Sequence, residues 1–393
     1  MNLETERQLR RLVGVPLESN ADEARVALVP TVIPQLTRSG LEVVVERGAG
    51  TSAGFPDDAY ESHGARLGSR EDVLEADIVV RVRGWGVDDD GSLGVSHPDQ
   101  VVIGMADPLG SPLAVRAAAD HKLIAIALDL IPRITRAQAM DALSSQATVT
   151  GYRAVLLAAD RLPKMLPMLT TAAGTIPPAQ VFVVGAGVAG LQAIATARRL
   201  GAVVQAYDVR PAAQEDIESL GARSVLLPLA PGDAGDAGGY AKELSEAFYR
   251  RQQELLAEVA AGVDVLVTTA MIPGAPAPLL ITATAVARMQ PGSVIVDCAA
   301  ERGGNCALTR ADETVVTDNG VTILGPTNLP STVPHDASLM YAKNVAALLG
   351  LITREGRLAL DEEDEIVRQT VVTRDGEIVN GRVLRALEEV RDV

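Results

Sequence analysis

Three glycines followed by an aspartate form the clearest chemical pattern in this chain. Gly185, Gly187 and Gly190 are spaced as G-x-G-x-x-G, and Asp208 follows about 20 residues later. The first glycine permits a sharp turn, the second lets a pyrophosphate approach the backbone, and the last lets a helix pack closely on a strand. A carboxylate at this distance can accept hydrogen bonds from both ribose hydroxyls and repels a 2′-phosphate. The pattern therefore predicts a dinucleotide site that favours NAD(H) over NADP(H).

The segments around the glycines are those that such a site requires. Residues 181–184 predict a buried strand, the stretch after the glycines predicts a helix ending at Gly201, and 203–207 predict a second strand. The helix N-terminus offers N–H groups and partial positive charge to phosphates. The residues expected to contact the cofactor here are Gly185, Gly187, Val188, Ala189, Gly190, Asp208, Val209 and Arg210. Two alternatives stay open: a glycine turn in an ordinary βαβ unit with a solvated aspartate, and an Arg210 that relaxes the preference for NAD(H).

The composition excludes several classes of protein. With 393 residues, of which 47% are hydrophobic and 22% charged, the chain is long enough for two globular domains. A net charge of −16 argues against binding to nucleic acid or to anionic lipid. No apolar run approaches the ~18 residues that span a bilayer, and no apolar signal segment follows the charged N-terminus. We therefore expect a cytoplasmic protein without direct membrane insertion.

Few residues are available for metal binding or for proton transfer by histidine. The cysteines and histidines are Cys298, Cys306, His63, His97, His121 and His335. The cysteines form no C-x-x-C pair and have few histidines nearby in the sequence, so neither a disulfide framework nor a zinc site is expected. No metal site is predicted.

Strand-like and helix-like segments alternate along the chain, which is typical of parallel, doubly wound sheets. We predict an α/β protein with two Rossmann-like domains and a cleft between them, the second domain inserted in the first. The first domain comprises residues 1–143 and 334–393, and the second comprises 144–333 with a mobile loop at 230–241. Further expectations are a long helix at 135–161, a strand at 225–229 and a solvated acidic tail around 361–365.

Several longer runs resemble a known family. The chain is similar to the NAD(H)-binding alpha subunit (domain I, alpha-1 type) of proton-translocating NAD(P) transhydrogenase, in the alanine dehydrogenase/transhydrogenase family. The similar runs include IPRITRAQAMDALSSQATVTGYRAV, TAAGTIPPAQVFVVGAGVAGLQAIATARRLGA, GGYAKELSEAF and PGSVIVDCAAERGGNC. The resemblance extends from about Leu12 to about Leu351 and implies the fold of alanine dehydrogenase.

This resemblance implies site residues beyond the glycine turn. They are Arg133, Ile134, Thr135, Arg136, Gln138, Asp141 and Ser144 in the family's Arg-Gln-Asp loop, Gly239 and Tyr240 in its mobile loop, and Met271 after a strand. Catalytic roles fall to Arg133, Gln138, Asp141 and Tyr240, and all of the set except Asp141 are expected to contact the cofactor. In the family the Arg-Gln-Asp loop holds the nicotinamide and its ribose close to the second nucleotide. Without the resemblance, these polar residues stand at a helix start, where capping would explain half of them.

The resemblance also implies an activity and partners. The chain is expected to transfer a hydride between its own NAD(H) and NADP(H) bound on a partner beta subunit, while separate membrane subunits translocate protons. Transfer between two nicotinamides requires placement and no general acid or base. The implied assembly is a homodimer with an NADP(H)-binding beta subunit and a separate membrane-anchor subunit, on the cytoplasmic face of the bacterial inner membrane. No nucleic-acid partner is expected.

Two other functions stay open. One is a free-standing, alanine dehydrogenase-like amino-acid dehydrogenase: Arg25 matches the substrate arginine of that enzyme, but Arg81 stands where it has a lysine and residues 105–107 contain no histidine. Arginine cannot act as the base because its pKa stays above ~12. The other is a non-catalytic NAD-sensing module. Asp297 and Glu301 receive no catalytic role, and a structural carboxylate at a strand end is the preferred interpretation.

Overall fold

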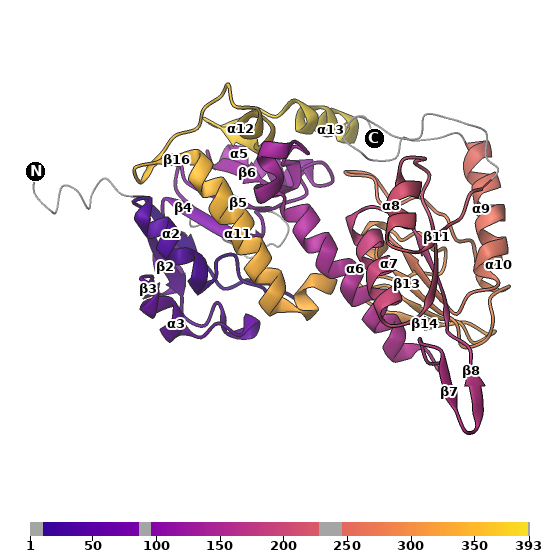
Figure 1. Cartoon of the computed structure of the whole chain (residues 1–393). Coiled ribbons are helices and arrows are strands. Elements are labelled where there is room, and N and C mark those ends of the chain that lie inside the picture. The colour runs from indigo at the N-terminus through magenta and orange to yellow at the C-terminus, as the bar shows by residue number, and fades with distance from the viewer. Residues whose placement is uncertain (1–10, 86–95, 228–245, 392–393) are drawn as a thin grey trace, which may run out of the picture. The chain divides into compact units, whose positions relative to one another are not determined.

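The computed structural model describes residues 11–85, 96–227 and 246–391, which form two compact α/β units (Figure 1). Unit 1 comprises Met1–Gln146 and Pro330–Val393, and unit 2 comprises Ala147–Leu329. Each unit has its own sheet and its own hydrophobic cores. The predicted fold class, α/β with Rossmann-like parallel sheets, is confirmed. Within the described residues, no helix is both long and apolar enough to cross a membrane.

Unit 1 contains an eight-stranded sheet in the order β19-β18-β6-β5-β4-β1-β2-β3. The strands are β1 Leu12–Val15, β2 Glu42–Glu46, β3 Arg66–Gly68, β4 Ile78–Arg83, β5 Val101–Met105, β6 Ile124–Ala127, β18 Val371–Arg374 and β19 Glu377–Ile378. The strands from β1 to β6 pair in parallel, and β18 and β19 extend the sheet antiparallel. The four residues of β6 are all buried, as expected for a strand covered on both faces.

Helices cover both faces of this sheet. One face carries α2 Ile33–Arg38, α11 Pro334–Ile352 and α12 Glu365–Thr370, whose apolar residues share one core with the strands. The other face carries α4 Arg70–Leu74, α5 Pro112–Asp120 and α13 Gly381–Arg391. The remaining elements of unit 1 are η1 Pro30–Val32, η2 Thr51–Ala53, α3 Asp57–Ser62, η4 Leu128–Leu130, η5 Thr135–Met140, η7 Leu329–Thr332, β16 Thr353–Arg354 and β17 Arg357–Leu358.

The C-terminal tail is more structured than the sequence suggested. Besides its acidic cluster, it supplies α12, β18, β19 and α13, and β18 lies beside β6 in the sheet. The Thr373 hydroxyl is buried, donates to the Leu123 carbonyl and accepts from the Ala125 N–H. Because these contacts join β18 to β6 within the sheet, the tail is part of the core of unit 1.

Unit 2 contains a seven-stranded sheet in the order β11-β10-β9-β12-β13-β15-β14. The strands are β9 Gln180–Val184, β10 Val203–Tyr207, β11 Arg223–Ser224, β12 Val265–Thr268, β13 Val294–Asp297, β14 Thr314–Val316 and β15 Thr322–Leu324. All pair in parallel except β14. The chain order reverses between β9 and β12, which is where open α/β sheets bind ligands at the carboxyl ends of their strands.

The helices of unit 2 also cover both faces of its sheet. One core contains residues of α6 Ala142–Arg161, α7 Val188–Arg199 and α8 Ala213–Ser219, and the opposite core contains residues of α9 Glu246–Ala260 and α10 Ala283–Val286. The short helix η6 is Ala300–Arg302. A hairpin of β7 Leu169–Thr171 and β8 Gly174–Ile176 projects from the unit (Figure 1).

Two predicted segments were wrong. The single helix expected at 135–161 is interrupted, because Asp141 leaves the helical conformation at φ −72° and ψ 85° and separates η5 from α6. The strand expected at 225–229 lies earlier, at β11. Just beyond β11, the Val225 N–H still donates to the Ala206 carbonyl. Residues 228 and 229 lie outside the described part of the chain. The β7–β8 hairpin was not anticipated.

Candidate dinucleotide site

The three glycines of the G-x-G-x-x-G motif each occupy a position that excludes a side chain or leaves room for a ligand. Gly185 follows β9 with φ +99°, and a Cβ atom there would lie 2.6 Å from the Thr269 hydroxyl oxygen. A Cβ at Gly190 would lie 1.8 Å from the Gly185 carbonyl oxygen, so helix α7 packs directly on the turn. A Cβ at Gly187 would meet no atom of the described residues within 4 Å. This geometry matches a turn, an open approach to the backbone and a close packing contact.

The N-terminus of α7 lies at the carboxyl end of β9. Gly187 is the N-cap residue, has no side chain to accept from the first N–H groups, and is exposed together with Val188. The helix is 12 residues long, so its dipole and its terminal N–H groups favour an anion at this end. The predicted cofactor contacts Val188 and Ala189 belong to this first turn. The arrangement can bind a pyrophosphate without any basic side chain.

Asp208 follows β10 and is already surrounded by donors. Its Oδ2 accepts from the Ala186 N–H at 2.7 Å and from Arg210 Nη2 at 3.0 Å. Its Oδ1 accepts from the backbone N–H of Arg210 at 2.8 Å and from Arg210 Nε at 2.9 Å. Two carboxylate oxygens offer about four acceptor positions, so the ribose hydroxyls compete with the Arg210 side chain for Asp208. The sequence had singled out both residues, but not their pairing.

A buried polar cluster shapes the loop after β12, which carries Met271. Asn305 is fully buried, donates to the Ala270 and Pro278 carbonyls and accepts from the Ala270 N–H. Met271 itself is exposed. Asn305 therefore holds the loop on which the predicted contact lies. Sequence reasoning missed it, and its only signal was its place in the run ERGGNC.

Asp297 has a structural role in the same region. Its buried carboxylate accepts from the hydroxyls of Thr268 and Thr309 and from the N–H groups of Ala299 and Cys306, at 2.7 to 3.1 Å. These donors connect the end of β13 to the segment that contains Asn305. Glu301 is exposed on η6.

In unit 1 the residues of the predicted Arg-Gln-Asp loop lie on η5 and at the start of α6; we call residues 133–144 the clamp loop. Arg133, Thr135, Arg136 and Gln138 are exposed, and Ile134 is half-buried. Among the described residues, the Gln138 side chain has no hydrogen-bond partner. The loop rests on Ala137 and Met140, which are buried in the core with residues of α11.

Asp141 and Ser144 pair with each other at the N-terminus of α6. The Asp141 carboxylate accepts from the Ser144 N–H at 2.8 Å and from the Ser144 hydroxyl at 2.5 Å. This is the hydrogen-bond pattern of a helix cap. Capping thus accounts for Asp141 and Ser144, whereas Arg133 and Gln138 are exposed on the loop. Gly239 and Tyr240, the predicted mobile-loop contacts, lie outside the described residues.

In the sheet of unit 1 the chain order also reverses, between β1 and β4. There the side chain of Glu18 binds the backbone at the end of β4. The buried Glu18 carboxylate accepts from the N–H groups of Val82 at 2.7 Å and Arg83 at 3.3 Å. Burial raises the pKa of Glu18 to about 7, against the opposing effects of nearby Arg81 and these hydrogen bonds. Glu18 is therefore an internal acid that the structure shields from solvent.

Arg25 lies nearby and is bound internally as well. Its Nε and Nη2 donate to the two carboxylate oxygens of Glu23 at 2.7 and 2.6 Å, and its Nη1 donates to Gln146 Oε1 at 2.8 Å. Arg25 and Glu23 are both buried. A small carboxylate substrate would have to share this guanidinium with Glu23.

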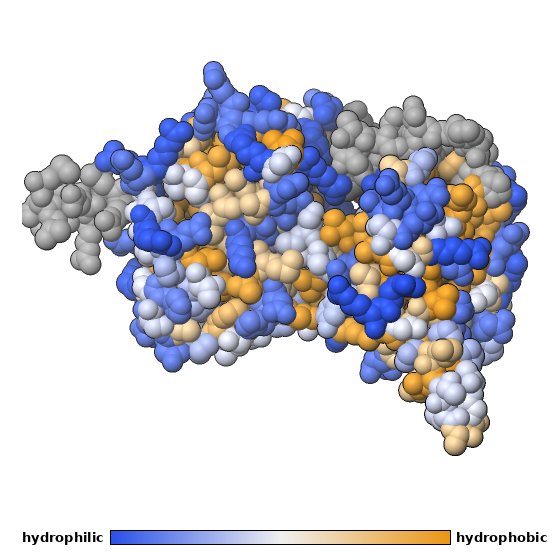
Figure 2. Space-filling model, viewed as in Figure 1, coloured by the Kyte–Doolittle hydropathy of each residue, from blue (hydrophilic) through white to orange (hydrophobic). Residues whose placement is uncertain are grey.

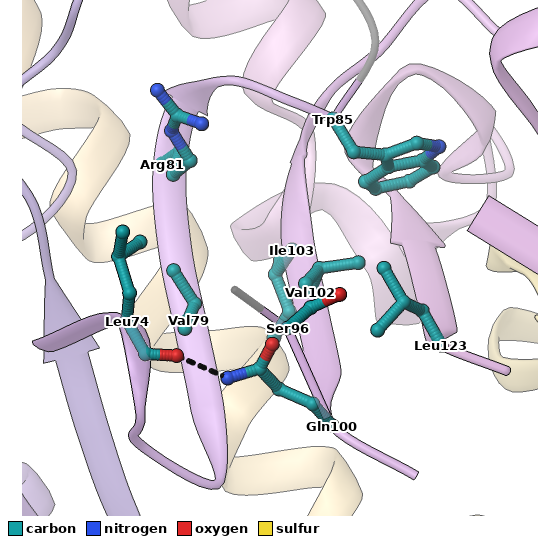
Figure 3. Close-up of a pocket in the computed structure, with 9 residues that line it drawn as sticks. All are labelled: Leu74, Val79, Arg81, Trp85, Ser96, Gln100, Val102, Ile103 and Leu123. Carbon is teal, nitrogen blue, oxygen red and sulfur yellow. Dashed lines mark hydrogen bonds between the residues drawn. The ribbon is translucent and has the colours of Figure 1, made fainter. Parts of the chain in front are cut away.

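A small cavity lies beside β4 and β5 in unit 1 (Figure 3). At one end Gln100 donates to the Leu74 carbonyl at 2.6 Å, and the Arg81 side chain lies at the other end. As the described residues outline it, the volume is about 20 Å³, room for about one water molecule. This cavity is too small for a nucleotide, so it is not part of the candidate site.

Comparison with known proteins identifies the family. Residues 14–150 match the family model "Alanine dehydrogenase/PNT, N-terminal domain", and residues 154–381 match "Alanine dehydrogenase/PNT, C-terminal domain". The chain is 45% identical over 378 residues to an NAD(P) transhydrogenase alpha subunit of Rhodospirillum rubrum, the first of the parts into which that subunit is divided. The match covers 94% of this chain and 97% of that protein.

A solved transhydrogenase structure from Sinorhizobium meliloti matches with a TM-score of 0.82 and 42% identity, covering 94% of this chain and 99% of the other. Alanine dehydrogenase of Bacillus subtilis is more distant, at 26% identity over 384 residues, covering 96% of this chain and 94% of that protein. The resemblance inferred from the sequence is thereby confirmed. The chain belongs to the alanine dehydrogenase/PNT family and, within it, to the NAD(P) transhydrogenase alpha subunits.

Proposed function

We propose that this chain is the NAD(H)-binding alpha subunit of a proton-translocating NAD(P) transhydrogenase. It transfers a hydride between its own NAD(H) and NADP(H) held by a partner subunit. The observation that carries this proposal is the 45% identity to the Rhodospirillum rubrum alpha-subunit chain over nearly the full length of both proteins. The glycine turn and Asp208 support it, because they provide the chemistry that binds NAD(H).

Some of the site residues bind the dinucleotide, and others orient its nicotinamide. The N–H groups at the start of α7 bind the pyrophosphate, and the carboxylate of Asp208 accepts from the adenosine ribose as Arg210 moves aside. On the clamp loop, the Gln138 amide and the Arg133 guanidinium orient the nicotinamide through hydrogen bonds. The nicotinamide supplies the hydride. The protein contributes placement, which is worth several kcal/mol (roughly 7 to 11 at the limit) when reacting atoms are held about 3 to 3.5 Å apart.

An amino-acid dehydrogenase is the second candidate because alanine dehydrogenase shares the fold. Oxidative deamination requires a group that accepts a proton near the substrate. In unit 1 the corresponding positions hold Arg81, which cannot act as a base, and Arg25, which is bound to Glu23 and Gln146. These contacts favour hydride exchange over deamination. Oxidation of an amino acid by the isolated chain would reverse this preference.

The partners follow from the same assignment. We propose an NADP(H)-binding beta subunit and a separate membrane-anchor subunit as partners, which would hold this chain on the cytoplasmic face of the bacterial inner membrane. Transfer of the hydride then occurs on this chain and its NADP(H)-binding partner, and proton translocation occurs in the membrane subunits.

For the homodimer, we assign the β7–β8 hairpin as a region of the contact between two copies. Met165, Met168 and Ile176 are exposed at and next to this arm, and Figure 2 shows apolar surface at its base. Replacing both Met168 and Ile176 by lysine should shift the sedimenting species from dimer to monomer while each copy stays folded. Lysine at Val316, which is equally exposed elsewhere in unit 2, is the matched control.

The test of function uses Gln138. With the NADP(H)-binding partner supplied, Gln138→Asn shortens the amide by one methylene and should lower the hydride-transfer rate while NADH affinity stays close to that of the unmodified chain. The loss falls on the transition state, because the shorter amide still binds but no longer orients the ring. Gln35→Asn, an exposed residue on α2, is the control. A Gln138→Asn chain that transfers hydride at the unmodified rate would remove Gln138 from the mechanism.

A further inference from the structure

Arg136, one of the expected cofactor contacts, is engaged by another residue of the chain. Its Nη1 donates to Asp364 Oδ2 at 2.6 Å and its Nη2 donates to Asp364 Oδ1 at 2.9 Å. Two parallel hydrogen bonds between a guanidinium and a carboxylate fix direction as well as distance. Arg136 thus lies on η5 with its donor pair directed at the tail of the chain. A cofactor contact would have to compete with this bidentate pair.

Asp364 is itself held in place. It is the N-cap residue of α12, where its Oδ1 accepts from the Ile366 N–H at 2.8 Å, and its side chain is only 14% exposed. Ile366 and Val367 on α12 are buried in the core of unit 1. The hydrogen bond from Arg136 keeps the pKa of Asp364 below its ordinary value, so the carboxylate stays charged near neutral pH. Asp364 is therefore a fixed anchor.

A second connection holds the other end of the same loop. Asn344 on α11 is 7% exposed; its Nδ2 donates to the Ala139 carbonyl at 2.9 Å, and its Oδ1 accepts from the Ser145 hydroxyl at 2.7 Å. One buried amide thereby joins the end of η5 to the first turn of α6. Gln138 lies between the two connections, two residues after Arg136 and one before Ala139.

We propose that Arg136 is a positioning residue that acts through Asp364, and that the pair, together with Asn344, sets where the clamp loop presents Gln138. The C-terminal segment, remote in sequence, thus determines the geometry of hydride transfer without contacting the nucleotide. This inference rests on the proposed function of the clamp loop. Misplacing a reacting group by about 1 Å can cost roughly 100-fold in rate, so a loosened tether should affect transfer more than binding.

The test is a double-mutant cycle on the full chain with the NADP(H)-binding partner supplied. Arg136→Gln and Asp364→Asn should each lower the hydride-transfer rate by roughly tenfold, with NADH dissociation constants within about twofold of the unmodified chain. The double variant should match either single variant, because both remove the same interaction. Glu363→Gln removes one negative charge at an exposed neighbour and should change neither quantity.

Three outcomes would overturn the inference. Weaker NADH binding in Arg136→Gln alone would make Arg136 a cofactor ligand. Additive losses of the transfer rate in the double variant would show that Arg136 and Asp364 act independently. An equal loss of rate in Glu363→Gln would indicate a general charge effect. Hydrogen exchange separates this inference from the proposed function. Asp364→Asn should speed exchange of the amides at 134–141 relative to Glu363→Gln, even if no partner supports transfer. Unchanged exchange in Asp364→Asn would refute the tether directly.

Discussion

Replacing Asp208 by asparagine tests how the chain recognises NAD(H). The change keeps the size of the side chain but removes the charge that four donors from Ala186 and Arg210 now surround at 2.7 to 3.0 Å. A hydrogen bond to a charged group contributes about 1.5 to 3 kcal/mol. In the unmodified chain, some of that energy is spent in displacing Arg210 from Asp208, a cost that is smaller in the variant. We therefore expect a loss near the lower limit, roughly tenfold in NADH affinity.

The measurement is calorimetric titration with NADH, accompanied by a thermal unfolding curve to exclude a folding defect. Asp318→Asn, an exposed aspartate in the same unit, is the matched control and should bind NADH as the unmodified chain does. Arg210→Gln should bind NADH at least as tightly as the unmodified chain, because it removes the competing donor. Asp208→Asn with NADH affinity within twofold of the unmodified chain would refute the assignment of Asp208 to the ribose.

Three further predictions concern the glycine turn and the buried acid. Gly190→Ala places a methyl group against the Gly185 carbonyl and should destabilise unit 2 by about 1 to 3 kcal/mol, seen as a lower midpoint in urea. The added methyl group of Gly187→Ala meets no atom in the described part of the chain, so this variant should keep that midpoint and weaken NADH binding in the same titration. Glu18 binds its proton more tightly when folded, because burial raises its pKa from 4.5 to about 7. The folded state therefore holds more protons between these values, and its stability falls as pH rises from about 4.5 to 7, by up to about 3 kcal/mol. Urea unfolding at pH 5 and 8 should show a smaller change in stability with pH for Glu18→Gln than for the unmodified chain. Some change remains in the variant, because burial also raises the pKa of Asp129, to about 6. If the stability of Glu18→Gln depends on pH as strongly as that of the unmodified chain, the raised pKa of Glu18 is contradicted.

Helices and strands whose positions follow from the local sequence pattern could be predicted from the sequence. Strands β9 and β10 were found because apolar runs stop at glycines or at Asp208, and the turn between β9 and α7 followed from glycine spacing. The interruption before α6 could not be found in this way, because 135–161 is compatible with a helix throughout. Asp141 breaks it by capping α6, and an aspartate within a helical pattern is equally consistent with an exposed position.

Contacts between segments distant in sequence could not be predicted from the local sequence pattern. The pairing of Arg136 with Asp364 joins residues 228 positions apart, and Asn344 meets Ala139 across 205 positions. Neither aspartate nor asparagine carries a local signal for such a partner. The pairing of Asp208 with Arg210 is local, yet the sequence could not show whether the guanidinium turns toward the carboxylate or away from it.

The most direct test of the central claim is to measure reduction of NAD⁺ by the full chain, first alone with L-alanine and then with NADPH and an NADP(H)-binding transhydrogenase beta subunit. If the chain is a transhydrogenase alpha subunit, NADH should form only in the second mixture, at a rate that depends on both nucleotides. Steady NADH formation from L-alanine by the chain alone, without transfer from NADPH when the beta subunit is present, would contradict the account and identify an amino-acid dehydrogenase.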